Sequence, residues 1–371
     1  MAPNTPQDDQ EARALTYEQE LFKPLKKNNL QNELNTTLNI TYRQNVWWRL
    51  KENRLGFSAL AIIVLLSILA IIGPYLTPFS YSGQILALKN KAPGYTFYLK
   101  YKENSNGTIK IIEYSEKPLK NEEGFKVEKR IFWFGSDALG RDLFTRLWHG
   151  ARISLFIGIV TAFIVFIIGV TYGGIAGYFG GWIDEIMMRI VEMLACIPFL
   201  LYVILLMVLL EPGLKAILIA LGFVYWLPLA RLVRGQILSL KEQEYVDAAR
   251  VAGAGSWRIL FKHLLPNALG PIIVYVTLAI PEAIFTEAWL SFVGLGVGAP
   301  IASWGSLVKE GFQGIRSYPW QLFFPAFFIT LTILAFNILG DSLRDAFDPR
   351  CGLPVVTSPR SKSVNRLTKN F

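Results

Sequence analysis

The feature that most limits the possible folds of this chain is a series of long apolar runs. The first extends from Leu55 to about Gly73, which is long enough for a helix to cross a hydrocarbon core of about 30 Å. Residues 151–341 consist largely of similar runs, interrupted by one polar, basic stretch. We therefore predict an all-α polytopic membrane protein with about six spans, at residues 55–73, 153–176, 190–210, 214–233, 268–290 and 320–340.

Composition agrees with this class. The 371 residues are 52% hydrophobic and only 18% charged, and the mean hydropathy is +0.36. The net charge of +9 could suit nucleic-acid binding, but no nucleic-acid readout module is found. Basic residues beside spans instead follow the positive-inside rule. Residues 231–267 hold six Lys and Arg, against two in residues 291–319, which predicts that the former face the cytoplasm.

The alternation of polar and apolar segments predicts the organisation of the chain. Both ends are expected in the cytoplasm, with a multi-pass core in the membrane. The predicted parts are a cytoplasmic N-terminal segment (1–54), a first transmembrane helix (55–74), an extracytoplasmic loop (75–150), a transmembrane core (151–341) and a cytoplasmic tail (342–371).

Part of the extracytoplasmic loop has a β pattern. Residues 95–134 alternate apolar and polar side chains on either side of Asn106-Gly107. An Asn-Gly pair between alternating runs is a strong hairpin signal. We therefore predict a small extracytoplasmic β insertion here.

The polar stretch at residues 244–267 has the pattern of two short helices. Apolar and small residues recur at helical spacing up to Ala252, and a break is expected at Gly253 to Gly255. The second helix should begin near Ser256, as an N-cap, and Pro266 should stop or redirect it. At Gly253 the turn is expected to need backbone angles that a Cβ disfavours.

This stretch, here called the island, carries charges together with apolar side chains. Such a mixture suits docking into a protein groove, where aromatic and Arg anchors carry most of the binding energy. An ordinary interfacial loop with solvated charges is the alternative. The expected cations are Arg250, Arg258, Lys262 and His263, and the expected apolar anchors are Tyr245, Val251, Trp257 and Phe261.

The island resembles the EAA loop of ABC-importer permeases. Asp247 stands in place of the eponymous Glu, and His263 stands where the general pattern has Ile. Asp247 keeps the negative charge, and His-Leu-Leu-Pro-Asn is similar to the peptide-importer branch. The residues that match are Asp247, Ala248, Ala249, Gly253, Leu265 and Pro266.

Other segments resemble the C-type subunit of the oligopeptide and dipeptide (peptide/nickel) importers. They are FGSDALGRDLFTRLWHGARIS before the second span, a stretch around Glu287 to Gly305, and LGDSLRDAFDPR near the end. The turn Gly140-Arg141-Asp142 places opposite charges next to each other, which favours a local ion pair and helix cap over a contact with partner subunits.

The resemblance implies a multi-pass permease subunit of a binding-protein-dependent peptide importer, located in the inner membrane of a bacterial cell. Its implied partners are a second permease, two cytoplasmic ATP-binding subunits, an extracytoplasmic substrate-binding protein and membrane lipid; no nucleic acid and no cofactor is implied. The residues expected to couple to the ATPase are Glu244, Tyr245, Asp247, Ala248, Ala249, Gly253, Arg258, His263, Leu265 and Pro266.

Two carboxylates inside a predicted span are candidates for the pathway. Glu282 and Glu287 are costly in a bilayer and should face the bundle interior or a water-filled path. Because they lie about 140° apart around a helix, they need not share a face. Two roles are considered for Glu287: structural hydrogen bonding, and gating of the translocation pathway.

No catalytic motif is found. Without a G-x-x-x-x-G-K-[ST] loop the chain is not expected to hydrolyse ATP itself, and the two histidines, His149 and His263, lie in different segments, so no metal site is expected. An oligopeptide is the first expected substrate and a dipeptide the next, with a nickel-chelate or glutathione importer as alternatives within the family. An autonomous secondary transporter is the rival class, although it would be expected to show internal repeats.

Overall fold

The computed structural model describes residues 42–103, 109–118, 126–298 and 300–347. The chain divides into two compact units, residues 1–49 and residues 50–371. Of the first unit the structure describes only the beginning of helix α3 (Tyr42–Glu52), so most of the predicted N-terminal segment lies outside the described residues, as does the tail after residue 347. The fold below is that of the second unit.

Within the described residues, five helical segments are long and apolar enough to cross a membrane, or six if one bent pair counts as a span. This confirms the prediction of an α-helical membrane protein with about six spans. The five segments are α4 (Arg54–Ile72) with its 3₁₀ extension η1 (Gly73–Tyr75), α5 (Leu143–Phe179), α8 (Leu214–Val224) with α9 (Trp226–Leu240), α11 (Ser256–Arg258) through α12 (Leu265–Val293), and α14 (Trp320–Phe347).

The prediction of one straight span at 190–210 was wrong, because the chain bends there. That range falls across two helices, α6 (Gly181–Cys196) and α7 (Phe199–Leu210), which meet at an angle of 82°. Pro198 disfavours helical geometry in the residue before it, and Ile197 is extended (φ −83°, ψ 124°). Hydropathy alone gives no sign of this break, because the residues on both sides of it are apolar.

Helix α5 is a single 37-residue helix that begins well before the predicted span at 153–176. Its start is fixed by Asp142, whose side chain accepts a hydrogen bond from the Thr145 backbone N–H as an N-cap. Small residues along one face let α9 approach closely. A Cβ at Gly169 would lie 2.9 Å from the Leu229 side chain, and one at Gly177 would lie 2.8 Å from the Arg234 carbonyl oxygen.

The island connects α9 to α12 by way of α10 (Glu244–Val251), α11 and a π-helical turn, η3 (Ile259–Leu264). Of the two effects predicted for Pro266, to stop or to redirect the helix, the stop was wrong, because the helix continues through it. Across η3 the backbone bonds shift to i→i−5, as in the bond from Leu265 N–H to the Leu260 carbonyl, so Pro266 enters where the usual ladder is already interrupted. The Asn267 amide then donates to the His263 carbonyl at 2.9 Å.

After α12 the chain forms α13 (Trp304–Gln313) and then α14. The first residues of α13 are held by a capping box between Ser303 and Ser306. Helix α14 ends at Phe347 and so continues into the stretch predicted as a tail.

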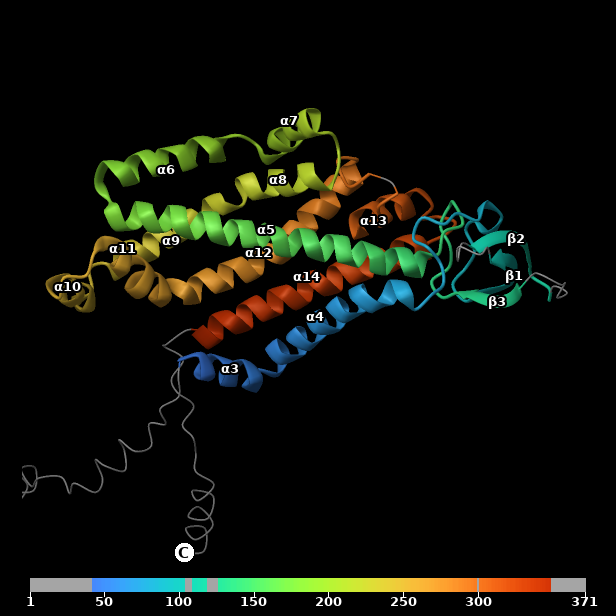
Figure 1. Cartoon of the computed structure of the whole chain (residues 1–371), viewed down its shortest axis with the longest axis horizontal. Coiled ribbons are helices and arrows are strands. Elements are labelled where there is room, and N and C mark those ends of the chain that lie inside the picture. The colour runs from blue at the N-terminus through green and yellow to red at the C-terminus, as the bar shows by residue number, and fades with distance from the viewer. Residues whose placement is uncertain (1–41, 104–108, 119–125, 299, 348–371) are drawn as a thin grey trace, which may run out of the picture. The chain divides into compact units, whose positions relative to one another are not determined.

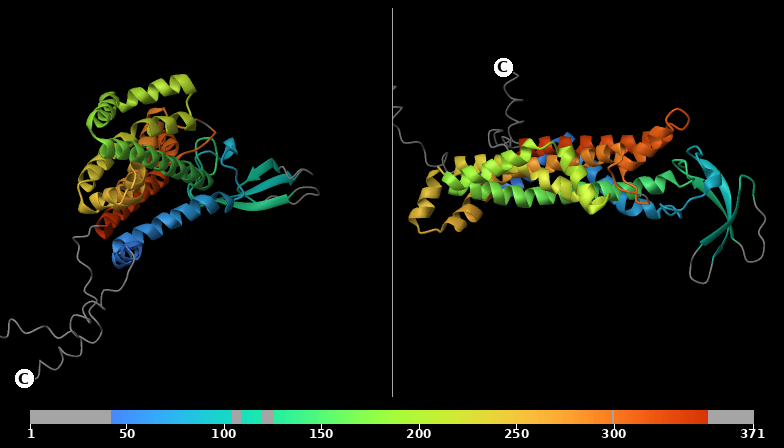
Figure 2. Two further views of the ribbon diagram at one scale, coloured as in Figure 1. Left: turned by 60° about the vertical axis from the view of Figure 1, so that its left-hand side comes forward. Right: turned by 90° about the horizontal axis from the view of Figure 1, so that it is seen from above.

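The β insertion predicted in the loop is a three-stranded antiparallel sheet. Strands β1 (Tyr95–Glu103), β2 (Ile109–Ser115) and β3 (Lys126–Phe132) lie in the order β2-β1-β3. The β1–β2 pairing confirms the predicted hairpin, although its turn at Asn106-Gly107 lies outside the described residues. One face packs on the short helix η2 (Leu86–Leu88). In Figures 1 and 2 the sheet lies at one end of the helices and α10 at the other.

Candidate functional site

The island is a helix, a turn and a second helix, and the turn depends on one glycine. Gly253 has φ +83°, in the left-handed region that a Cβ disfavours, which confirms the backbone prediction made for it. Its N–H donates to the Arg250 carbonyl at 2.9 Å, and the Ala254 N–H donates to the Ala249 carbonyl at 3.0 Å. The predicted cap by the Ser256 hydroxyl was wrong: Gly255 is the N-cap of α11, and it has no side chain to donate or accept.

One side of the island is anchored in the helical core. Val246, Ile259, Leu260 and Leu264 are buried at 0–1% exposure and pack into a cluster with residues of α5 and α9. Burying an aliphatic side chain contributes about 1.5–3 kcal/mol. The island is therefore held in place by its own apolar contacts with the bundle.

The other side of the island presents apolar side chains to the outside. Val251 is 91% exposed, Trp257 55% and Phe261 50%. The Trp257 and Phe261 rings stack at a centroid distance of 5.8 Å, and Phe179 at the end of α5 meets Trp257 edge-on at 5.8 Å. These aromatic side chains are ordered by each other and remain available to a partner.

The structure brings all ten predicted coupling residues together on this short segment. Asp247 pairs with Arg250 at 3.0 Å on the exposed face of α10. Leu265 differs from the others because it is buried. The exposed members are Glu244, Tyr245, Asp247, Ala248, Gly253, Arg258 and Pro266, and the half-buried members are Ala249 and His263.

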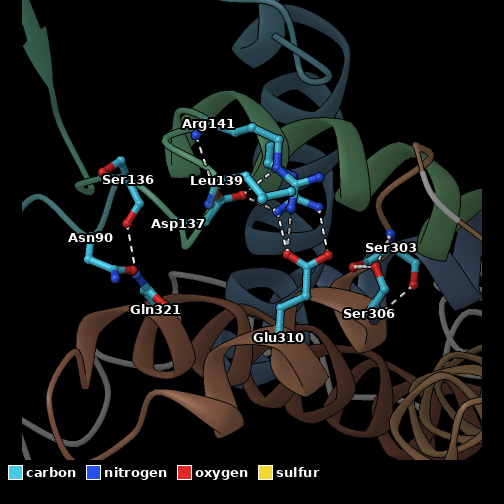
Figure 3. Close-up of polar contacts among 10 residues, drawn as sticks. Asn90, Ser136, Asp137, Leu139, Arg141, Ser303, Ser306, Glu310 and Gln321 are labelled. Carbon is cyan, nitrogen blue, oxygen red and sulfur yellow. Dashed lines mark hydrogen bonds and ion pairs between the residues drawn. The ribbon is translucent and has the colours of Figure 1, made fainter. Parts of the chain in front are cut away.

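At the opposite end of the bundle, four charged side chains form a compact network, here called the clamp: Asp137, Arg141, Arg146 and Glu310. Figure 3 labels three of them, Asp137, Arg141 and Glu310. Arg141 Nε donates to Asp137 Oδ2 at 2.6 Å, and its Nη2 donates to Glu310 Oε2 at 2.9 Å. Arg146 donates to both Glu310 oxygens, at 2.5 and 3.0 Å, and also to Asp137. Two cations thus meet two anions.

The clamp joins segments that are distant in the sequence. Arg146 is 1% exposed, Asp137 4% and Arg141 6%, and Glu310 comes from α13, 164 residues after Arg146. Beside them Gln321 of α14 donates to Asn90 and to the Ser136 carbonyl, at 3.0 and 2.8 Å (Figure 3). These bonds fix the loop after the β sheet against α5, α13 and α14.

The sequence analysis identified part of this network. It predicted a local ion pair and a cap at Gly140-Arg141-Asp142, and Asp142 does cap α5. The Arg141 partners, however, are Asp137 and Glu310 rather than the adjacent Asp142. Sequence reasoning missed Glu310; the one available signal was that an Arg at position 146, leading into an apolar run, needs a buried carboxylate somewhere.

The Asp142 carboxylate, just before α5, is buried and has a raised pKa. Its Oδ2 accepts from the Thr145 N–H at 2.9 Å and from the Thr145 hydroxyl at 2.6 Å. Burial raises the pKa of Asp142 to about 6, and the bonds from Thr145 oppose that rise. In the part of the chain that the structure describes, Oδ1 has no hydrogen-bond partner.

The two predicted pathway carboxylates occupy different environments. Glu287 is fully buried, and its carboxylate accepts hydrogen bonds from Ser154 of α5 at 3.1 Å and Ser291 at 2.7 Å. Glu282 lies on the exposed face of α12. The expectation that they need not share a face is confirmed. No group of three or more His, Cys, Asp or Glu residues with metal-binding geometry occurs in the described ranges.

Comparison with known proteins gives the family. Residues 169–352 match the model for the binding-protein-dependent transport system inner membrane component, and residues 41–93 match the N-terminal TM domain of oligopeptide transport permease C. A dipeptide transport system permease protein DppC of Bacillus subtilis is 48% identical over 84% of this chain and 87% of its own length. This chain belongs to the binding-protein-dependent transport permeases.

Other relatives of this permease have similar names. The oligopeptide transport system permease protein OppC of Bacillus subtilis is 43% identical over 89% of this chain and 97% of its own length, and OppC of Escherichia coli strain K12 is 37% identical over 81% and 89%. Among solved structures, an inward-facing MetNI methionine ABC transporter has a TM-score of 0.46 at 22% identity, over 55% of this chain and 96% of that chain. That likeness is too low to add to the family assignment.

Proposed function

We propose that this permease forms one half of the translocation pathway of an ATP-driven peptide importer, the other half coming from a second permease. The observation that carries the proposal is the combination of a peptide-permease family over most of the chain with an island that is anchored on one side and exposes aromatic side chains on the other. Oligopeptides are the first expected substrate and dipeptides the next, because the relatives carry those two names.

The island is the proposed contact with the ATPase subunits. Its exposed Trp257 and Phe261 side chains have the character of interface anchors, and Arg258 lies between them in the sequence. No ATP-binding loop is found in this sequence, so hydrolysis is assigned to two partner subunits. Ala249 is half-buried and packs against the cluster that anchors the island, so a large or charged side chain there would displace the island and disturb docking indirectly.

We place the island in the cytoplasm and the β sheet outside. The basic composition of residues 231–267 supports this orientation, and so does the position of the sheet and α10 at opposite ends of the helices (Figure 1). The sheet and the clamp would then face the extracytoplasmic substrate-binding protein. Labelling tests this in a chain whose native cysteines are replaced: an impermeant thiol reagent should modify cysteine at Lys117 but not at Gly255 in intact cells, and the reverse pattern would invert the orientation.

Reconstituted uptake tests the function itself. Proteoliposomes that contain this chain, its second permease and the two ATPase subunits should accumulate a labelled peptide when ATP and the loaded binding protein are supplied. Accumulation driven by an ion gradient without ATP would instead identify a secondary transporter. Accumulation of a nickel chelate or glutathione in preference to peptides would keep the family and change the substrate.

A further inference from the structure

One face of α12 carries a polar stripe inside an apolar span. Tyr275, Glu282 and Thr286 lie within about 40° of one another around the helix, because their spacings are seven and four residues. Glu282 is eleven residues before the end of α12 at Val293, or about 16 Å along the axis. This depth lies well inside a span whose residues are mostly apolar.

A fourth polar side chain joins the stripe from a neighbouring segment. Tyr225, at the junction of α8 and α9, shares a hydrogen bond of 2.6 Å with the Thr286 hydroxyl. Because Thr286 lies one helical turn after Glu282, this bond brings the Tyr225 hydroxyl to the face of α12 that carries Glu282 and Tyr275. The stripe therefore combines one anion with two tyrosines, whose hydroxyl oxygens and ring faces both attract cations.

The anion at the centre of this stripe has no counter-charge among the residues that the structure describes. Its carboxylate takes part in none of the ion pairs or hydrogen bonds found there, whereas Glu287 on the same helix accepts bonds from Ser154 and Ser291. Glu282 is exposed, and so are Phe285 at 60% and Trp289 at 42%. An uncompensated carboxylate at this depth is costly in contact with lipid, so its face must meet water or a cation.

We propose that Glu282, with Tyr225, Tyr275 and Thr286, forms a cation-binding station that receives the amino-terminal ammonium of a peptide in transit. The inference rests on the proposed peptide-import function and names which end of the substrate the pathway recognises. Charge complementarity supports it, since a zwitterionic peptide carries its positive charge at one end. Within the described residues the Glu282 carboxylate has no ion-pair partner, so it is free to bind the ammonium of the substrate.

The test separates substrate contact from assembly and coupling. Glu282→Gln removes the charge and keeps the size, and Glu192→Gln, which neutralises an exposed carboxylate on α6, is the matched control. In reconstituted importer, Glu282→Gln should lower the kcat/KM of peptide uptake about tenfold or more, the loss expected for a charged hydrogen bond. ATP hydrolysis stimulated by the loaded binding protein should stay within about twofold of the unmodified value, and Glu282→Asp should recover part of the uptake.

Two results would overturn the station. If Glu282→Gln no longer co-purifies with the second permease, the carboxylate pairs with a cation of that subunit instead. If uptake is unchanged while Glu192→Gln is also neutral, Glu282 faces water without contacting substrate. If the unmodified importer takes up no peptide, the proposed function fails first, and the same variants can be measured on whichever substrate is accumulated.

Discussion

The two ends of the helical bundle use charge in opposite ways. At the clamp, Arg141 and Arg146 are buried and fully matched by Asp137 and Glu310. At the island the one ion pair, between Asp247 and Arg250, is exposed, and the surface also carries bare aromatic side chains. The clamp thus pairs its formal charges within this chain. We infer that the island, which leaves its apolar anchors exposed, docks another subunit.

The largest effect is expected at the clamp. Arg146→Met should lower the free energy of unfolding by about 3–5 kcal/mol, because it leaves Glu310 and Asp137 with one cation between them. The matched control is Arg189→Met, which breaks an exposed pair with Glu192 and should cost about 1 kcal/mol or less. Denaturation in mixed micelles measures both; equal effects would show that burial of the clamp contributes nothing.

The next effect is on association rather than stability. Ala249→Asp should weaken capture of the ATPase subunits by about 2–4 kcal/mol, roughly a hundredfold, because it places an unpaired charge against the apolar cluster that anchors the island and so displaces the docking surface. Ala87→Asp makes the same change at an exposed alanine of η2 at the sheet end and should leave capture unchanged. Co-purification with the ATPase subunits and stimulated ATP hydrolysis measure the outcome. Normal values in Ala249→Asp would show that the island is an ordinary solvated loop and does not dock the ATPase subunits.

A smaller effect tests the turn of the island. Gly253→Val forces a β-branched residue to φ +83°, at a cost of about 1–2 kcal/mol, and should misdirect α11. Gly255 has φ −69° and open space around its Cα, so Gly255→Val should be tolerated. The two variants are compared by ATPase capture and by unfolding; equal behaviour would mean that the backbone angle at Gly253 does not position the second helix.

The smallest effect is a pH dependence at the sheet end. Because burial raises the pKa of Asp142 to about 6, its folded-state pKa exceeds its unfolded value, and protonation stabilises the fold. That contribution is complete below pH 3.8 and is lost as the pH rises through 6. Asp142→Asn should therefore be more stable than the unmodified chain by about 1 kcal/mol or more at pH 8, and this advantage should shrink below pH 6 and disappear as the pH falls to 3.8. An advantage that is constant with pH would exclude the carboxyl as its source.

The sequence predicted the parts of the fold that depend on local pattern. Apolar runs gave the helical spans, alternation around Asn106-Gly107 gave the paired strands β1 and β2, and Gly253 marked the turn of the island. The bend at Pro198 was not predicted, because hydropathy gives no information about a backbone break inside an apolar run. Continuation through Pro266 escaped because a π-helical turn depends on hydrogen bonds that composition does not reveal.

The candidate site likewise has residues that local sequence predicts and residues that it does not. The island residues were predictable because the whole motif lies in one contiguous stretch. Glu310 was not predictable, because it lies 164 residues after Arg146 in the sequence. A pattern of nearby residues cannot indicate a partner at that separation. The different environments of Glu282 and Glu287 followed in part from helix geometry, which separates their faces, but which of the two is buried depends on Ser154 from another helix.

The unbroken helix α5 has a mechanical consequence. Its 37 residues span about 55 Å, which exceeds the thickness of a hydrocarbon core of about 30 Å. Its first residues lie in the clamp, and its last residue, Phe179, touches Trp257 of the island. A push or tilt applied at one membrane surface therefore reaches the other through a single stiff rod, without a hinge along its length and without a chain of intermediate side-chain rearrangements.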